Sequence, residues 1–367
     1  AALRPALGVR VMLKSLRIIL FASLTVMVAT GTTGSRPLSR ARFQDMGVVA
    51  PSADDPLSVM TYNVRGLPWP IAWGRADALA QIGDRLAALR RAGRQPHILL
   101  LQEAFTPEAR AIAARAGYAH VVAGPDRRMR GPAPVSARDR TYLARARWDR
   151  GEAADKQFGS GLLILSDYPI LSAARLAFPA HACAGFDCLA NKGALVARLA
   201  VPGMAQPVHV VNTHLNARKA AGVPIARSQR AFERQVDLLT RFVRAQVPED
   251  APLILGGDMN IGRDPARQRA FFDRWANAGM GFVAPQLSGA RRAQAPLPQE
   301  QAALAATAER GKDWLFARDG AGRPMRVKQA RVPFGAAPDT ALSDHVGYML
   351  RYAQEADRVT LAGLAAE

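Results

Sequence analysis

Cysteine is scarce in this sequence of 367 residues, which contains only Cys183 and Cys188. They stand in the segment HACAGFDCLANKG, where too few ligands lie nearby to complete a tetrahedral zinc site. In an oxidising compartment the two thiols can form a small loop disulfide, whereas in a reducing compartment they would stay free. Export, argued below, and the position of both residues in one polar loop favour the disulfide, but the sequence does not fix the Cα separation that a disulfide requires.

Long hydrophobic runs are also missing, apart from one near the N-terminus. The run IILFASLTVMVAT (residues 18–30) follows three basic residues and is itself followed by small ones. This pattern is typical of a secretory signal, and the run is shorter than a membrane-spanning helix. We therefore predict a signal peptide within residues 1–34 and an exported protein, periplasmic or secreted and peripheral to membranes. A retained membrane anchor is the alternative.

Acidic residues are outnumbered, with 30 Asp and Glu against 49 Lys and Arg, which gives a formal net charge of +19. Such a surface attracts phosphate-bearing partners, either nucleic acid or anionic lipid headgroups. An arginine-rich composition can equally be a genome-wide habit, so charge alone does not identify a substrate. Many arginines fall in residues 125–157, which show no strand pattern. We interpret this stretch as a basic surface insertion, with a functionless disordered loop as the alternative.

The rest of the sequence alternates short apolar runs with amphipathic helical patterns. Runs such as residues 57–63 (LSVMTYN) and 97–102 (HILLLQ) are typical of buried strands. Helices are expected to begin where Thr106 precedes a proline, where Asp264 does so again, and at about residue 226. This order predicts one α/β domain over residues 52–353. It is expected to follow a linker (35–51), to precede a tail (354–367), and to contain further strands at 161–165, 194–199, 208–212, 253–255 and 346–350.

Polar side chains stand where the predicted strands end, and strand ends converge at one rim of a sheet. Glu103 follows the run ILLLQ and is a hard oxygen ligand suited to Mg²⁺, while Asn63 can supply a neutral oxygen nearby. His214, in VVNTHLNA, can donate a hydrogen bond to a phosphoryl oxygen. Taken singly, each of these residues is more typical of a strand-end cap, a turn or a structural histidine.

Two further segments supply what hydrolysis of a phosphodiester requires. In LILGGDMNI, Asp258 can hold an attacking water while Asn260 donates to phosphate, although such a segment alone is typical of a turn. In LSDHVGYML, His345 is the candidate general base, because the unperturbed pKa of imidazole lies nearest neutral pH. Asp313, in KDWLF, can orient that imidazole and stabilise its protonated form, or can simply cap a helix or strand.

Seven motifs occur in a fixed order along the chain: YNV, QEAF, SGLLILSDYPI, NTHL, GGDMN, DWLF and SDH. Their succession resembles the endonuclease/exonuclease/phosphatase superfamily and spans nearly the whole chain after residue 56. The resemblance implies a DNase I-like fold, a four-layered α/β sandwich of two packed mixed β-sheets flanked by helices, and a metal-dependent hydrolase using Mg²⁺ or Mn²⁺. The implied roles are metal binding by Asn63 and Glu103, phosphate contact by His214 and Asn260, positioning of the nucleophile by Asp258, completion of the metal and base region by Asp344, and proton abstraction by His345.

Within this superfamily the chain is most similar to the neutral sphingomyelinases. The segment RGLPWPIAWGRADALAQIGDRL after the first strand and the segment NTHLNA resemble signatures of that branch. DCLANKGAL carries Asp187 and Lys192 at the spacing of a switch pair in one membrane-bound animal relative. The resemblance implies hydrolysis of sphingomyelin to ceramide and phosphocholine at a phospholipid surface, with no stable protein partner.

Two alternatives remain open at this point. Nucleases of the superfamily share the catalytic residues, so a secreted DNase I-like enzyme acting on nucleic acid is the first. The second is a non-catalytic lipid- or nucleic-acid-binding module, against which the intact residues Glu103, His214, Asp258 and His345 argue.

The loop after the first predicted strand is the segment that we expect to contact a membrane. Secreted bacterial sphingomyelinases carry an exposed aromatic hairpin before the Ser-Asp-His motif, whereas residues 319–340 contain Phe334 as their only aromatic residue. We therefore expect residues 67–73, which include Trp69 and Trp73, to present an apolar lip beside the site instead. Burial in the core is the alternative for these residues, and the preferred one for Ile71.

Overall fold

Two β-sheets pack face to face in the structure, a computed structural model that describes residues 52, 56–134, 136–280 and 295–353. The six-stranded sheet has the order β10-β11-β1-β2-β4-β3, and the five-stranded sheet has the order β5-β6-β7-β8-β9. Both contain parallel and antiparallel pairs, since β1 runs parallel to β2 and β7 parallel to β8. The strands of the first sheet are β1 (Leu57–Asn63), β2 (Ile98–Gln102), β3 (His120–Ala123), β4 (Leu163–Ser166), β10 (Val327–Phe334) and β11 (Gly347–Tyr352); those of the second are β5 (Ile170–Ala177), β6 (Gly193–Leu199), β7 (Val208–His214), β8 (Leu253–Asp258) and β9 (Asp313–Arg318).

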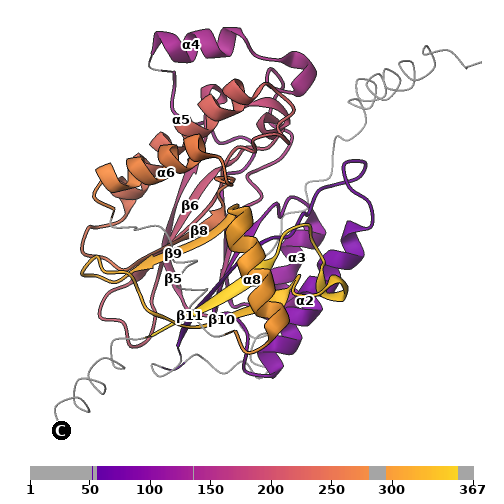
Figure 1. Ribbon diagram of the computed structural model, residues 1–367, viewed down its shortest axis with the longest axis vertical. Helices are drawn as coiled ribbons and strands as arrows, with labels where there is room; N and C mark the ends of the chain where they lie inside the picture. The colour runs from indigo at the N-terminus through magenta and orange to yellow at the C-terminus, as the bar shows by residue number, and fades with distance from the viewer. Residues whose placement is uncertain (1–51, 53–55, 135, 281–294, 354–367) are drawn as a thin grey trace, which may run out of the picture. The chain divides into compact units, whose positions relative to one another are not determined.

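Alternation along the central strands explains the layering. On β1, Val59 packs into the core between the sheets, while its neighbour Met60 packs beneath helices α2 (Arg75–Arg91) and α3 (Pro107–Arg115). This follows from the period of two that a strand imposes on side-chain direction. The second sheet is covered by α5 (Ile225–Gln246) and α6 (Pro265–Asn277), so the expected four-layered sandwich is confirmed (Figure 1).

The predicted helix starts are confirmed by their caps. The Thr106 hydroxyl accepts from the backbone N–H of Ala109, and the Asp264 carboxylate accepts from the N–H groups of Ala266 and Arg267. A proline occupies the first turn of both helices, where a missing N–H costs nothing. The predicted strands are also present, whereas β3, β5, β9 and β10 were not expected as strands. β5 and β10 have largely part-exposed patterns and lack a continuous apolar run.

The basic insertion is ordered, so the disordered-loop alternative for residues 125–157 is wrong for the parts described, 125–134 and 136–157. It contains α4 (Ala137–Ala144), whose first turn is held by a capping box between Ser136 and Asp139. Buried ion pairs fasten it to α5: Asp139 lies 3.2 Å from Arg234, and Glu152 lies 2.8 Å from Arg227. Because each buried carboxylate meets a guanidinium, the insertion has a fixed position on the domain.

Several expectations about the chain ends fall outside the described residues. These are the signal peptide within residues 1–34, the linker 35–51 and the tail 354–367, and the bounds 52–353 of the domain therefore stay a prediction. Among the described residues, no helix has both the length and the apolar character needed to cross a bilayer. Helix α8 (Pro298–Arg310), not foreseen from the sequence, packs near β10.

Candidate active site

Sheet register brings distant residues of the second sheet into one row. His214 ends β7 and pairs with Asp258 at the end of β8, which in turn pairs with Asp313 at the start of β9. Side chains opposite one another in adjacent strands share a face, so these three groups face the same way. The close approach of β7 and β8 requires a glycine at position 257, where a Cβ would lie 1.9 Å from the Thr213 carbonyl oxygen.

The first sheet supplies Asn63 and Glu103 to the same place. Asn63 ends β1, and Glu103 directly follows β2, which pairs with β1. The Asn63 amide nitrogen donates to Glu103 at 2.9 Å and to Asp258 at 3.2 Å, which joins the rims of the two sheets. Below them, Gln102 donates to Asn212 of β7 at 2.8 Å. Asn63, Glu103 and Asp258 therefore lie together, as expected for polar residues at strand ends.

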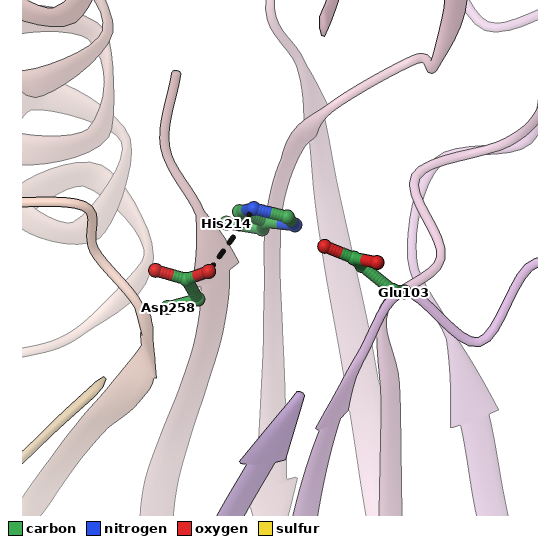
Figure 2. Close-up of side chains that lie close together, drawn as sticks. All are labelled: Glu103, His214 and Asp258. Carbon is green, nitrogen blue, oxygen red and sulfur yellow. Dashed lines mark ion pairs between the residues drawn. The ribbon is translucent and has the colours of Figure 1, made fainter. Parts of the chain in front are cut away.

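Glu103, His214 and Asp258 form a compact group, with one potential ligand atom from each lying within 4.8 Å of the others (Figure 2). Burial raises the pKa of Glu103, although the Asn63 hydrogen bond and Lys192 oppose that rise. Two closely spaced buried carboxylates repel each other unless a cation or a proton intervenes. The donor set of carboxylate oxygens and imidazole therefore suits a divalent cation.

A second group consists of Asp258, Asp313 and His345. The Nδ1 atom of His345 lies 2.8 Å from both Asp313 carboxylate oxygens, and its Nε2 atom lies 3.7 Å from Asp258. Burial lowers the pKa of His345, but Asp313 and Asp258 outweigh burial and raise it to about 9. Asp313 thus holds the ring with Nε2 directed at Asp258, as the sequence argument expected of Asp313.

His214 has different neighbours from those its predicted role requires. The Lys192 ammonium donates to its Nε2 atom at 3.0 Å, while burial, followed by Lys192, lowers the pKa of His214 to about 3. A neutral imidazole that accepts at Nε2 cannot donate from that atom to a phosphoryl oxygen in this arrangement. Asp187 accepts from Lys192 at 2.9 Å, so the predicted Asp187–Lys192 pair exists and reaches the cluster. Cys183 and Cys188 form a disulfide around the short 3₁₀ helix that carries Asp187, with a Cα separation of 5.3 Å.

Asn260 and Asp344 are not placed as the sequence analysis expected. The Asn260 amide nitrogen donates to the Leu215 carbonyl at 3.0 Å, so it braces the backbone after β7. Asp344 belongs to neither group: its carboxylate is more than half exposed and lies 3.9 Å from Arg65. Its neighbour His345 takes the inward direction, which turns Asp344 outward. The role of Asp344 in the metal and base region therefore stays a prediction.

Strained backbone conformations occur next to the candidate active site. Among the described residues, three that are not glycine have positive φ angles: Arg65 at 49°, Glu103 at 57° and Asn260 at 47°. The left-handed region is costly for a side chain such as that of Glu and persists only where the surroundings fix it. Glu103 directly follows β2, whereas Arg65 and Asn260 come two residues after the ends of β1 and β8. For Glu103 the unusual backbone directs the carboxylate toward Asn63.

Arg267 is a supporting residue that the sequence analysis missed. Its side chain on α6 is fully buried and donates to the carbonyl oxygens of Asn216 and Asn260, each at 2.7 Å. It thereby holds the loops after β7 and β8 together behind His214 and Asp258. In a sequence so rich in arginine, a single Arg on an amphipathic helix gives no signal that it is buried.

Fold and site together define the class of this protein. The chain matches the Endonuclease/Exonuclease/phosphatase family over residues 60–345 and belongs to that family. Members of this superfamily are metal-dependent phosphoester hydrolases. The resemblance inferred from the seven motifs is therefore confirmed.

Similar proteins include sphingomyelinases and a toxin. A sphingomyelinase C from Listeria ivanovii is 27% identical over 118 residues, which are 31% of this chain and 34% of the relative. This match thus spans about a third of the length of that curated relative. Among solved structures, sphingomyelinase C from Streptomyces griseocarneus shares the fold, with a TM-score of 0.56 and 22% identity over 81% of this chain and 99% of that one. A beta toxin double mutant from Staphylococcus aureus with bound magnesium ions also has a TM-score of 0.56, at 17% identity over 81% of this chain and all of that one.

Proposed function

We propose that this protein is an exported, Mg²⁺-dependent phosphodiesterase that hydrolyses sphingomyelin to ceramide and phosphocholine. The observation that carries the proposal is a largely buried group of carboxylates and imidazoles, Glu103, Asp258 and His345 among them. Asn63, which contacts two of them, directly precedes a loop with two exposed tryptophans. The local similarity to a sphingomyelinase C supports the substrate. Export is supported by the basic and apolar N-terminal segment and by the Cys183–Cys188 disulfide, which suits an oxidising compartment.

Glu103 and Asp258 are the residues that would hold the cation, with Asn63 fixing both carboxylates. Burial raises the pKa of Glu103, so its charge is costly until a positive group offsets it. When bound, Mg²⁺ or Mn²⁺ would supply charge neutralisation for the phosphoryl oxygens and a more acidic water. Hard oxygen donors in this number favour these ions over soft metals.

Side chains of the protein would then accept the proton of the attacking water and stabilise the charge on the phosphoryl oxygens. Asp258 would hold the attacking water by accepting a hydrogen bond, and Nε2 of His345, when the ring is neutral, would take the proton of that water. A cation bound beside Asp258 would favour the neutral ring, because it would offset the carboxylate charge that raises the pKa of His345. The Asp313 carboxylate on Nδ1 stabilises the imidazolium that results. Lys192, which is nearly buried between Asp187 and His214, offers positive charge beside the phosphoryl group.

The loop after β1 provides the apolar surface that a lipid substrate needs. Trp69 is 62% exposed, Ile71 48% and Trp73 76%, so the preferred interpretation of Ile71 as a core residue is wrong. The two tryptophan rings meet edge to face, with centroids 6.0 Å apart. Phe334, in contrast, is fully buried against Tyr62 and offers no membrane contact. Exposed tryptophans favour the interface of a bilayer, where the ring is apolar and its N–H stays hydrated.

A parallel substrate assay tests the proposal directly. Purified protein is incubated with vesicles of sphingomyelin, vesicles of phosphatidylcholine and plasmid DNA, each with Mg²⁺ and with EDTA. We expect Mg²⁺-dependent release of phosphocholine, most rapidly from sphingomyelin. Faster degradation of the plasmid than of sphingomyelin would instead support the nuclease alternative, which the excess of arginine favours. No turnover of any substrate would support the non-catalytic binding module.

Replacing Trp69 and Trp73 together by Ala should lower turnover of sphingomyelin vesicles by about tenfold or more, since each indole loses its burial in the interface. Turnover of a soluble chromogenic phosphodiester should change little, because that substrate needs no apolar lip. Leu171→Ala is the matched control, since Leu171 is a similarly exposed apolar residue on β5. Equal losses on both substrates would show that the tryptophans act on the site and not on the membrane.

A further inference from the structure

A second exposed apolar surface lies near the cluster formed by Glu103, His214 and Asp258. It is separate from the tryptophan lip, the loop that carries Trp69 and Trp73. Trp148 is 81% exposed, Phe186 45% and Ile225 38%, although the three come from separate segments of the chain. Monomeric proteins seldom leave several large apolar side chains exposed together without a use for them. We call these three residues the insertion face, because Trp148 belongs to the insertion and the other two adjoin it.

Contacts join the three segments into one surface. Trp148 and Arg150 share a single 3₁₀ turn, and the Arg150 guanidinium lies over the Phe186 ring, 5.5 Å from its centroid. The Phe186 ring packs closely on Gly222, where an added Cβ would lie 2.9 Å from it. From Gly222 the chain passes directly to Ile225, the first residue of α5. Phe186 therefore lies between the 3₁₀ turn and the segment that leads into α5.

The insertion face adjoins the candidate active site. Phe186 precedes Asp187 on one short 3₁₀ helix, and Asp187 binds Lys192, which contacts His214. The tryptophan lip instead follows Asn63, which contacts Glu103. In Figure 1 the loop between β1 and α2 (indigo) and the insertion with α4 (magenta) both project beyond the sheets in the upper part of the view.

Exposed positive charge is also present on the insertion. Arg138, Arg140 and Arg145 are exposed on and just after α4, and none of them has an ion pair within the described part of the chain. Three acidic residues of the insertion offset little of this charge, while Asp126 and Asp155 are exposed elsewhere on the insertion. Asp139 and Glu152 are buried and already paired with arginines of α5, and Asp149 is shared between Arg147 and Arg150.

We propose that the insertion face is a second membrane-contact surface, which binds bilayers containing anionic lipid. The inference deepens the proposed function, on whose lipid substrate it rests, by naming a further lipid that brings the enzyme to its substrate. Unpaired arginines attract anionic headgroups, while Trp148 and Phe186 enter the interface. A membrane fits better than nucleic acid because Ile225 and its exposed neighbour Pro224 are apolar and can neither stack on bases nor pair with them.

Vesicle co-sedimentation in EDTA tests this surface without any turnover, so its outcome does not depend on whether sphingomyelin is cleaved. Vesicles of phosphatidylcholine alone are compared with vesicles of phosphatidylcholine and phosphatidylserine at low and high salt. We expect the wild type to bind the anionic vesicles more tightly, and salt to weaken that binding. Arg140→Ala with Arg145→Ala should weaken it by about fivefold for each arginine. Trp148→Ser with Ile225→Ser should weaken it by about tenfold.

Two matched variants control for overall charge and overall apolar surface. Arg241→Ala with Arg244→Ala removes the same charge from exposed positions near the other end of α5, and Leu171→Ser removes an exposed apolar side chain from β5. Both should bind as the wild type does, and unchanged melting temperatures would show that every variant is folded. Equal weakening by the control arginines, no effect of Trp148→Ser with Ile225→Ser, or displacement of the protein from vesicles by plasmid DNA through these same residues would overturn the proposal.

Discussion

Chelation of divalent cations with EDTA should reduce the phosphodiesterase activity of this protein to background, and added Mg²⁺ or Mn²⁺ should restore it. The reason lies in Glu103 and Asp258, two nearly buried carboxylates that a single Asn63 amide holds side by side. Without a cation, the charge that a phosphoryl transition state develops would add to that of the two carboxylates, and Lys192 alone would offset little of it. Activity is measured on a soluble chromogenic phosphodiester, so that membrane binding plays no part.

A binding measurement separates the metal from the chemistry. Mg²⁺ should raise the melting temperature, because an ion that binds only the folded state stabilises that state and relieves the repulsion between the two carboxylates. Glu103→Gln should abolish both this rise and the Mg²⁺-dependent activity. Asp84→Asn is the matched control and should retain both, because Asp84 is an exposed carboxylate on α2 that pairs with Arg115 and belongs to neither group of candidate ligands. Full activity in excess EDTA, or equal losses in the two variants, would contradict the metal site.

The fold was predictable from the sequence where local signals were strong. Buried strands such as β1 and β2 appear in the sequence as continuous apolar runs. The helices that begin after Thr106 and Asp264 are predicted by a capping side chain followed by proline. Strands β5 and β10 escaped prediction because their part-exposed residues carry no such run. Their place is fixed by pairing with β6 and β11, which local sequence does not record.

The candidate site was predictable as a set of residues but not as a set of contacts. Strand ends bring Asn63, Glu103, His214, Asp258 and His345 together, and this follows from topology once the strands are known. Which atom meets which neighbour depends on packing across the two sheets. The sequence analysis assigned His214 and Asn260 to phosphate contact. In the structure Lys192 donates to the Nε2 atom of His214, and Asn260 donates to a backbone carbonyl. The buried position of Arg267 also depends on tertiary packing alone.

His345→Ala should lower kcat on the soluble substrate by about 10²–10⁴-fold, the range that a positioned general acid or base contributes. His345 is almost fully buried, its Nδ1 atom is bound to Asp313 at 2.8 Å, and its Nε2 atom faces Asp258. Removing the imidazole leaves the carboxylates and the fold in place, so KM and the Mg²⁺-dependent rise in melting temperature should persist while proton transfer is lost. Asp313→Asn should also lower kcat, because the imidazolium would lose its stabilising charge.

His97 provides a matched control elsewhere in the same domain. Its Nδ1 atom lies 3.0 Å from the Asp167 carboxylate, so it forms the same kind of imidazole–carboxylate pair as His345, but it precedes β2 and belongs to neither group of candidate ligands. His97→Ala should therefore change kcat little, even if loss of the pair lowers the melting temperature. A His345→Ala variant that kept near-normal kcat, or a His97→Ala variant that lost as much, would show that His345 stabilises the fold and does not transfer the proton.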